Sequence, residues 1–237
     1  MNYFYITGAS RGIGKAIAEK LLQNEENTVF GISRTVSLEH PNYHHYSIDF
    51  NDLDAVKPFR FSDHPEALSV VLINNSGYLG PVFHLGNKNA EEIIKTFNIN
   101  IISAAVLMNE FCRTYNALPL KKMIINISSG AARFPIESWS EYCSTKAAMD
   151  MYSRVLDLEQ SRLQTEHPVK VYSVAPGIIE THMQEEIRQV DPENFSEVKR
   201  FRDYKENNEL KSTETVADEI QQLMLHPERF PEVVMEF

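Results

Sequence analysis

The sequence predicts an α/β fold, in which a single domain contains a doubly wound, mainly parallel β-sheet with helices on both faces. Two observations support this prediction. The expected strands are continuous apolar runs, which is typical of strands that are buried on both faces of a parallel sheet. These runs alternate along the chain with stretches of helical periodicity, and right-handed crossovers between parallel strands then place helices on both sides of the sheet.

The first half of the chain supplies one helix and four strands. Residues 3–7 form a short apolar run that leads into glycines, and the apolar residues between 13 and 22 recur at helical spacing. Residues 28–33 are β-branched and aromatic, as is typical of a strand. Two further strands are expected over 43–48 and 70–73.

The second half continues the alternation. Helices are expected over 90–115, 140–163 and 213–225, and strands over 123–127, 169–174 and 233–237. The segment from about 180 to 211 is charged, lacks long apolar runs and is the least regular part of the chain. Neither repeats nor a linker interrupt the sequence, so residues 1–237 are expected to form one domain.

Composition limits the classes of partner. The chain has 237 residues, of which 43% are hydrophobic and 24% charged, and its formal net charge of -10 argues against a nucleic-acid or anionic-membrane surface. Cys112 and Cys143 form no disulfide or metal pattern. The N-terminus does not resemble a signal peptide, and no apolar run approaches the ~18 residues of a membrane span. A cytoplasmic protein is therefore expected.

The turn after the first strand predicts a dinucleotide site. Its sequence, Thr7-Gly8-Ala9-Ser10-Arg11-Gly12-Ile13-Gly14, spaces the glycines as Gly-x-x-x-Gly-x-Gly and opens a helix. Glycines let a pyrophosphate approach the N-terminus of that helix, where free N–H groups and the helix dipole favour an anion. A plain strand-to-helix turn is the alternative.

Ser33-Arg34 at the end of the second strand favours NADP(H) over NAD(H). An acidic residue at this point would bind a ribose 2′-hydroxyl, whereas this chain has a cation there and a second cation, Arg11, in the glycine turn. Two guanidiniums can bind a 2′-phosphate through bidentate contacts. Two solvated surface arginines are the alternative.

Tyr142 and Lys146 lie four residues apart, and so share one face of the expected helix. An isolated tyrosine titrates near ~10, and a neighbouring ammonium favours its phenolate form. The pair can therefore deliver a proton, although this spacing also occurs by chance on solvated helices.

With these motifs in one order, the chain resembles a short-chain dehydrogenase/reductase of the single-domain, Rossmann-fold type. The resemblance runs from residue 3 to about 181. The residues that carry it are the glycine turn, Asp49, Asn74-Asn75-Ser76-Gly77, Asn100, Ser129, Tyr142 with Lys146, and Pro176-Gly177-Ile178-Ile179-Glu180-Thr181. The family usually has alanine where this chain has Ser76, and a small serine is expected to preserve the turn.

The resemblance implies a catalytic set. Tyr142 would protonate the substrate carbonyl oxygen, Lys146 would lower the pKa of Tyr142 and hold the nicotinamide ribose, and Ser129 would position the carbonyl. Asn100 would hold a water that links Lys146 to solvent. A hydroxyl donor and a cation near the carbonyl oxygen both stabilise the negative charge that develops there.

The resemblance also implies a set of cofactor-binding residues. Asp49 would bind the adenine amino group, with the backbone of Phe50 nearby, and residues of the turn 176–181 would cover the nicotinamide and its phosphate. The full set is Gly8, Ser10, Arg11, Gly12, Ile13, Gly14, Ser33, Arg34, Asp49, Phe50, Asn75, Ser76, Gly77, Tyr142, Lys146, Pro176, Gly177, Ile179 and Thr181.

Within the family, the pattern is similar to the sepiapterin reductase and benzil reductase group, on the basis of Ile32-Ser33-Arg34 and the short C-terminal ending. This implies NADPH-dependent reduction of a small-molecule ketone or diketone, with the variable segment 180–211 contacting substrate. The resemblance also implies a homodimer or homotetramer.

The sequence alone leaves several alternatives open. One alternative is a non-catalytic NADP-binding sensor on the same fold, which would be expected to lack one or more residues of the catalytic set that this chain retains. Another is an NAD-dependent alcohol dehydrogenase, which Arg34 opposes. Trp139 and Phe134 either line the substrate site or pack the start of the helix, and Met183, Ile187 and Phe195 either form a lid or pack a surface helix. His40, His44 and His45 are expected to be surface residues, so no metal site is expected. His182 is expected to be solvated.

Overall fold

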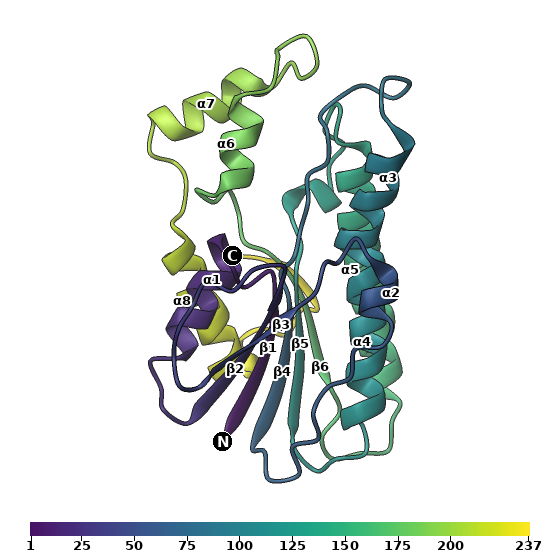
Figure 1. Ribbon diagram of the computed structural model, residues 1–237, viewed down its shortest axis with the longest axis vertical. Helices are drawn as coiled ribbons and strands as arrows, with labels where there is room; N and C mark the ends of the chain where they lie inside the picture. The colour runs from purple at the N-terminus through teal and green to yellow at the C-terminus, as the bar shows by residue number, and fades with distance from the viewer.

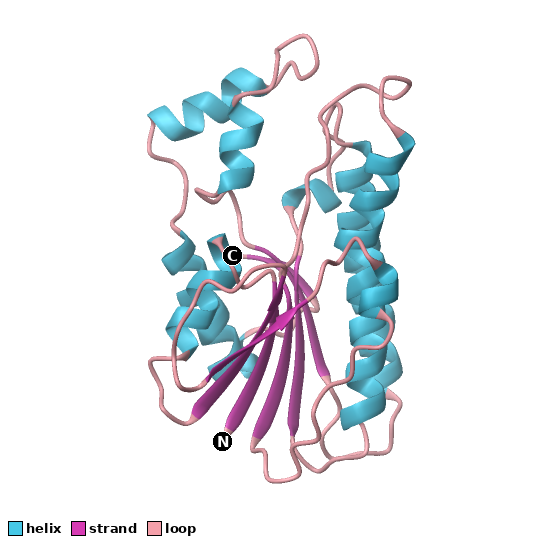
Figure 2. Cartoon of the chain, in the orientation of Figure 1, coloured by secondary structure: helices cyan, strands magenta, loops and turns pink.

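The computed structural model describes residues 1–237 and contains one parallel sheet of seven strands between two layers of helices (Figures 1 and 2). The strands are β1 (Asn2–Thr7), β2 (Asn27–Ser33), β3 (Tyr43–Ser47), β4 (Ser69–Asn74), β5 (Lys121–Ile127), β6 (Lys170–Ala175) and β7 (Val234–Glu236). Their order in the sheet is β3-β2-β1-β4-β5-β6-β7, and all neighbours are parallel. The predicted fold class is confirmed, and the strand order reverses between β1 and β4.

The helices divide between the two faces of the sheet. One face carries α1 (Gly12–Leu21) and α8 (Thr213–Leu225), whereas the other carries α2 (Leu53–Val56), α3 (Ala90–Phe97), α4 (Ser103–Tyr115) and α5 (Ser140–Ser161) (Figure 1). Beyond the carboxyl ends of the strands lie α6 (His182–Arg188) and α7 (Val198–Glu206). Short turns complete the chain: η1 (Asn98–Ile102), η2 (Gly130–Ala132) and η3 (Pro227–Arg229).

Two apolar cores explain why the strands are apolar throughout. Along β1, Phe4 and Ile6 pack in the core beneath α1 and α8, whereas Tyr5 points to the opposite face and packs against α4 and α5. Successive side chains of a strand point to opposite faces of the sheet. A strand covered on both sides therefore has no polar face, and all of these β1 side chains are buried.

The sequence-based element bounds agree with the structure to within two residues at every strand end. The predicted helix over 90–115 is continuous but contains a π-helical turn, η1, which places one extra residue in its middle. Such turns often accompany functional residues. None of the helices combines the length and the apolar composition that crossing a bilayer requires.

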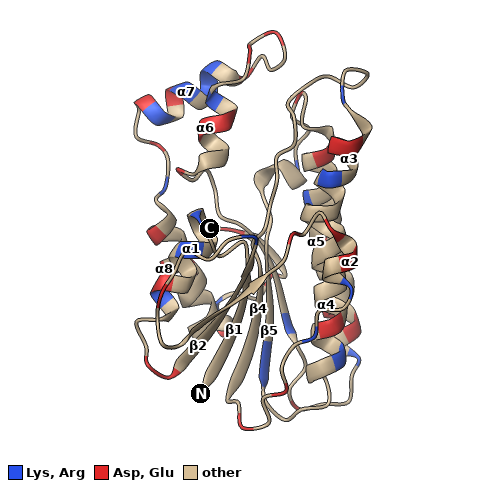
Figure 3. Ribbon diagram, viewed as in Figure 1, with Lys and Arg blue, Asp and Glu red and all other residues tan.

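The segment 180–211 differs most from its prediction, because it contains two ordered helices. Charged residues dominate α7, whose sequence is VKRFRDYKE, and they colour most of its ribbon in Figure 3. Its one fully buried residue is Val198. Val198 and Phe201 form a short apolar stripe that packs on the domain, but the six charged residues around them obscure this stripe in the sequence.

Candidate active site

A cleft of ≈ 1190 Å³ lies at the carboxyl ends of the strands, below α6 and α7. This is where ligands bind in open parallel sheets, next to the point where the strand order reverses. The cleft is lined by every sequence-predicted site residue except Gly14 and Asn100, which lie behind its wall. The structure therefore brings the predicted cofactor and catalytic residues together in one site.

The glycine turn between β1 and α1 requires its glycines. Gly8 and Gly12 have φ of +68° and +55°, a region that other residues rarely adopt. A Cβ at Gly14 would lie 2.4 Å from Asn75 Nδ2 and 2.5 Å from the Gly8 carbonyl oxygen. No side chain caps the start of α1, so its first N–H groups remain free to bind an anion such as a pyrophosphate at the edge of the cleft.

Hydrogen bonds join the turns that follow β1 and β4. Thr7 Oγ1 accepts hydrogen bonds from the backbone N–H groups of Asn75 and Ser76, at 2.9 Å and 3.0 Å. Asn75 Nδ2 donates in return to the Thr7 carbonyl, at 2.9 Å. The serine that departs from the family pattern, Ser76, fits the turn because its backbone makes the bond to Thr7.

The two arginines that favour NADP(H) lie at the same end of the cleft. Arg11 and Arg34 are both exposed and line the cleft, and neither guanidinium is paired with a carboxylate. Ser33 Oγ donates to the Thr35 carbonyl, at 2.9 Å, so this hydroxyl is already bonded within the protein. Asp49 Oδ1 accepts a hydrogen bond from the backbone N–H of Asn51, which fixes the carboxylate beside the cleft.

Tyr142 and Lys146 are buried on the face of α5 that meets β5. Lys146 Nζ donates to the Ile127 carbonyl, at 2.7 Å, and lies 5.6 Å from the centre of the Tyr142 ring. Burial lowers the pKa of Lys146 to about 8, against an opposing effect of Asp150. Burial also raises the pKa of Tyr142 to about 12, and the Ser129 hydroxyl opposes that rise.

Asn100 lies in the π-helical turn η1 and joins α5 to the turn after β4. Its Nδ2 donates to the Tyr78 carbonyl, at 2.8 Å, and to Thr145 Oγ1, at 3.1 Å, while its Oδ1 accepts from the Tyr78 N–H, at 2.7 Å. Both donors are thus used within the protein. The amide oxygen keeps one lone pair.

The far end of the cleft is apolar and aromatic. Trp139 stands edge-on to Tyr142, with ring centres 5.7 Å apart, and its other neighbours are Phe195 at 5.5 Å and Phe201 at 5.6 Å. Trp139 therefore both lines the cleft and packs the start of α5. Phe134, which is 68% exposed, lies on the cleft wall without such packing.

The residues of the predicted lid divide into two groups. Phe195 is fully buried and packs the loop after α6 against the domain, whereas Met183, which is partly buried, and Ile187, which is buried, both line the cleft. His182 is half exposed and lies beside Glu185 and Glu186 on its own helix.

Sequence reasoning missed some of the cleft lining, notably Tyr78, Leu79, Gln184, Phe201 and Tyr204. Tyr78 and Leu79 directly follow the Asn74–Gly77 motif, and that position was the signal that could have identified them. Phe201 and Tyr204 are three residues apart, but the charges of α7 obscure the spacing.

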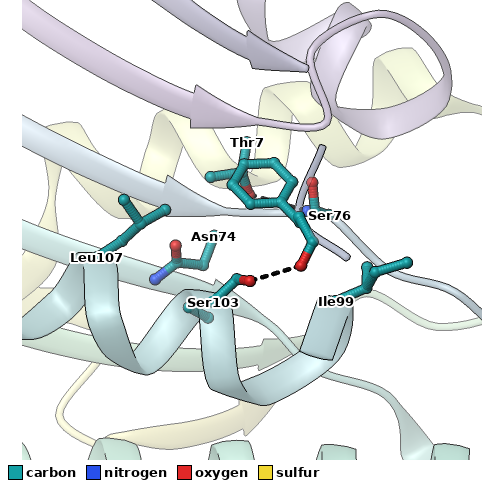
Figure 4. A pocket seen from close by; sticks show the side chains of 8 residues that line it. Thr7, Asn74, Ser76, Ile99, Ser103 and Leu107 are labelled. Carbon is teal, nitrogen blue, oxygen red and sulfur yellow. Dashed lines mark hydrogen bonds between the residues drawn. The ribbon is translucent and has the colours of Figure 1, made fainter. Parts of the chain in front are cut away.

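A second cavity, of ≈ 10 Å³, lies between β4 and α4 (Figure 4). Thr7, Asn74, Ser103 and Leu107 line it, and Ser103 Oγ donates to the Phe50 carbonyl, at 2.7 Å. Its volume corresponds to about one water molecule, so it is too small for a cofactor. His, Cys, Asp and Glu residues form no cluster of three or more that could hold a metal ion.

Comparisons with known proteins agree with this geometry. A family model described as short chain dehydrogenase matches residues 2–192. A benzil reductase ((S)-benzoin forming) from Bacillus cereus is 34% identical, and the match covers 98% of this chain and 97% of that protein. A sepiapterin reductase from Meriones unguiculatus is 30% identical over 92% of this chain and 89% of its own. A crystal structure of a short chain dehydrogenase/reductase from Saccharomyces cerevisiae superimposes with a TM-score of 0.83 at 27% identity, covering 100% of this chain and 96% of that one.

Proposed function

The chain belongs to the short-chain dehydrogenase family of oxidoreductases, and from this premise we propose that it is an NADPH-dependent reductase that converts a ketone or diketone carbonyl to an alcohol. One observation carries the proposal. The Ser129 hydroxyl, the Tyr142 phenol and the Lys146 ammonium meet in a single cleft whose other end is a glycine turn at a helix N-terminus.

The residues of the cleft fit a dinucleotide. Its pyrophosphate would lie against the uncapped start of α1, and a Cβ at Gly14 would force apart the turns that form this cradle. Arg11 and Arg34 would bind a 2′-phosphate, because both guanidiniums are free and face the same cleft. Asp49 would accept from the adenine amino group, and the turn 176–181 would cover the nicotinamide.

The bound cofactor supplies the hydride, and the chain supplies the proton. Ser129 would orient the substrate carbonyl toward Tyr142. Tyr142 would then donate its phenolic proton to the carbonyl oxygen as negative charge develops there. The Lys146 ammonium would stabilise the resulting phenolate and then transfer a proton to it. The remaining lone pair of Asn100 Oδ1 would hold a water through which solvent replaces the proton that Lys146 has lost.

The substrate end of the cleft favours an aromatic or otherwise apolar carbonyl compound. Trp139, Phe134 and Phe201 present aromatic surface there, and both curated relatives described above are named as reductases. Pockets lined by aromatic side chains with a few polar groups are typical of sites for small organic ligands. We therefore propose an aryl ketone or diketone as the substrate.

Two further features of the proposal concern the whole protein. Apolar side chains on α5, including Met151, Val155 and Leu158, are about half exposed, which supports the expected homodimer or homotetramer. The cytoplasm is the proposed location.

The test uses the wild-type protein. NADPH and NADH consumption are measured with a panel of diketones, aryl ketones and pterins, together with binding of both cofactors. Turnover with NADPH faster than with NADH supports the proposal. Tight NADPH binding without turnover of any carbonyl would favour the sensor, and alcohol oxidation driven by NAD⁺ would favour the alcohol dehydrogenase.

A further inference from the structure

A buried carboxylate lies one helical turn beyond Lys146. Asp150 is on α5, four residues after Lys146 and therefore on the same face of the helix, and it is 9% exposed. Its Oδ1 accepts two hydrogen bonds, from Ser128 Oγ at 2.6 Å and from Ser173 Oγ at 2.7 Å. Asp150 thus joins α5 to the ends of both β5 and β6.

A packing role alone does not explain this carboxylate. Burying a charge is unfavourable unless a partner compensates it, and two neutral hydroxyls compensate it only in part. No lysine or arginine forms a close ion pair with Asp150. An asparagine has the same shape and would fill the space without a charge. The negative charge therefore calls for a separate explanation.

The residues around Ser128 indicate what the carboxylate acts on. Ile127, immediately before it, accepts the hydrogen bond from Lys146 Nζ. Ser129, immediately after it, is the proposed carbonyl-binding residue. Two successive turns of α5 therefore bind two successive residues where β5 ends: Lys146 binds Ile127, and Asp150 binds Ser128. The next residue, Ser129, lines the cleft.

We propose that Asp150 is a positioning residue of the reductase site, which fixes the Ile127–Ser129 backbone through Ser128 and holds Lys146 in its ammonium form by its charge. This inference rests on the proposed function for its kinetic consequence. The physical claim about Lys146 itself does not depend on that function.

The charges around Lys146 support the proposal that Asp150 keeps it in its ammonium form. Burial is the main influence on its pKa and favours the neutral amine, and the charge of Asp150 opposes it. The other titratable group facing Lys146 is the Tyr142 phenol, on the same helix. The neighbouring strand end and turn present the Ile127 carbonyl and Gly77, which carry no charge.

The kinetic test compares Asp150→Asn with wild type over a range of pH. Carbonyl reduction needs the protonated Tyr142–Lys146 pair, so its rate falls as pH rises through the pKa of that pair. Removing a nearby negative charge lowers this pKa, and we expect the alkaline limb of kcat/KM to move to lower pH by about one unit. Asp157→Asn, the same change two turns further along α5, is the matched control and is expected to leave the limb in place.

A loss of rate at every pH without movement of the limb would overturn the electrostatic role. A limb that moves equally in Asp157→Asn would overturn it as well, because the effect would then belong to net charge.

A second measurement does not need activity. The side-chain signals of ¹³C-labelled lysines are titrated by NMR, and the Lys146 signal is identified by its loss in Lys146→Met. We expect this signal to titrate at lower pH in Asp150→Asn than in wild type. An unchanged titration, or a wild-type Lys146 that is already neutral at pH 7, would contradict the proposal. If wild type reduces no carbonyl but the Lys146 signal shifts as expected, the proposed function fails while the role of Asp150 stands.

Discussion

The two ends of the cleft are built in different ways. The cofactor end consists of backbone turns after β1, β2 and β4, which glycines and the Thr7–Asn75 bonds hold together. The substrate end consists of side chains that meet from distant segments, with Trp139, Phe195 and Phe201 packed against one another. One end depends on backbone conformation and the other on side-chain packing.

This difference predicts how each end responds to mutation. A backbone turn admits few residue types at fixed positions, so a single added methyl group disrupts it. A packed aromatic wall tolerates substitution and changes which ligand fits.

The largest effect is expected at the cofactor end, from Gly14→Ala. The new Cβ would lie 2.4 Å from Asn75 Nδ2 and 2.5 Å from a backbone oxygen, so α1 must move away from the turn. Overpacking of this kind costs about 1–3 kcal/mol. We expect NADPH binding to be lost in fluorescence titrations and the melting temperature to fall. Gly130→Ala is the control, because a Cβ at Gly130 would have only its chain neighbours within 4 Å, and its melting temperature should equal that of wild type.

Lys146 lies where the two ends of the cleft meet, and Lys146→Met should lower the activity while raising the stability of the protein. Loss of the ammonium is expected to lower the carbonyl reduction rate by about 10²–10⁴-fold. At neutral pH the same change should stabilise the protein, because burial holds the pKa of Lys146 at about 8, below its ordinary 10.5.

The sign of the stability effect follows from proton binding. Between the two pKa values the unfolded chain binds more protons, so the stability of wild type rises with pH in that window. The free energy of unfolding that wild type loses relative to Lys146→Met is therefore greatest below pH 8, where it is on the order of 3 kcal/mol. It disappears as pH approaches 10.5. Chemical denaturation of both proteins across this range measures it, and a destabilised variant at pH 7 would contradict the account.

Arg34→Ala tests the phosphate-binding part of the cofactor end. A charge-assisted hydrogen bond contributes about 1.5–3 kcal/mol, so NADPH should bind about 10- to 100-fold more weakly. NADH lacks the 2′-phosphate and should bind as before. Arg154→Ala, on α5 outside the cleft, is the control. Equal losses for both cofactors would remove the argument for a 2′-phosphate site.

The smallest effect is expected at the substrate end, from Phe201→Ala. This ring lines the cleft and contacts Trp139, and a lost apolar contact costs about 1–3 kcal/mol in substrate discrimination. We expect KM for an aryl diketone to rise about tenfold while the Kd for NADPH is unchanged. Leu85→Ala, an exposed residue outside the cleft, should alter neither value. A change in the affinity of Phe201→Ala for NADPH, without a change in KM for the diketone, would contradict the assignment of Phe201 to the substrate end.

The same difference between local turns and contacts among distant segments determines how much of the site could be predicted from the sequence. The strands, the helices over 90–115 and 140–163 and the glycine turn were identifiable, because apolar runs, periodicity and glycine spacing are local signals. The Tyr142–Lys146 pair was also visible, since both residues lie on one helix. Phe201 and Asp150 were not, because their importance arises from contacts with Trp139 and with Ser128 and Ser173, which only the folded chain brings together.

The most direct test of the proposed reaction is a single-turnover comparison of wild type and Tyr142→Phe, each loaded with NADPH and mixed with an aryl diketone. The ring remains in the variant and only the phenolic hydroxyl is removed, and both proteins are saturated with NADPH so that the comparison measures the chemical step. We expect wild type to consume the bound NADPH and Tyr142→Phe to do so at least about 100-fold more slowly. Equal rates in the two proteins would contradict the proposed reaction.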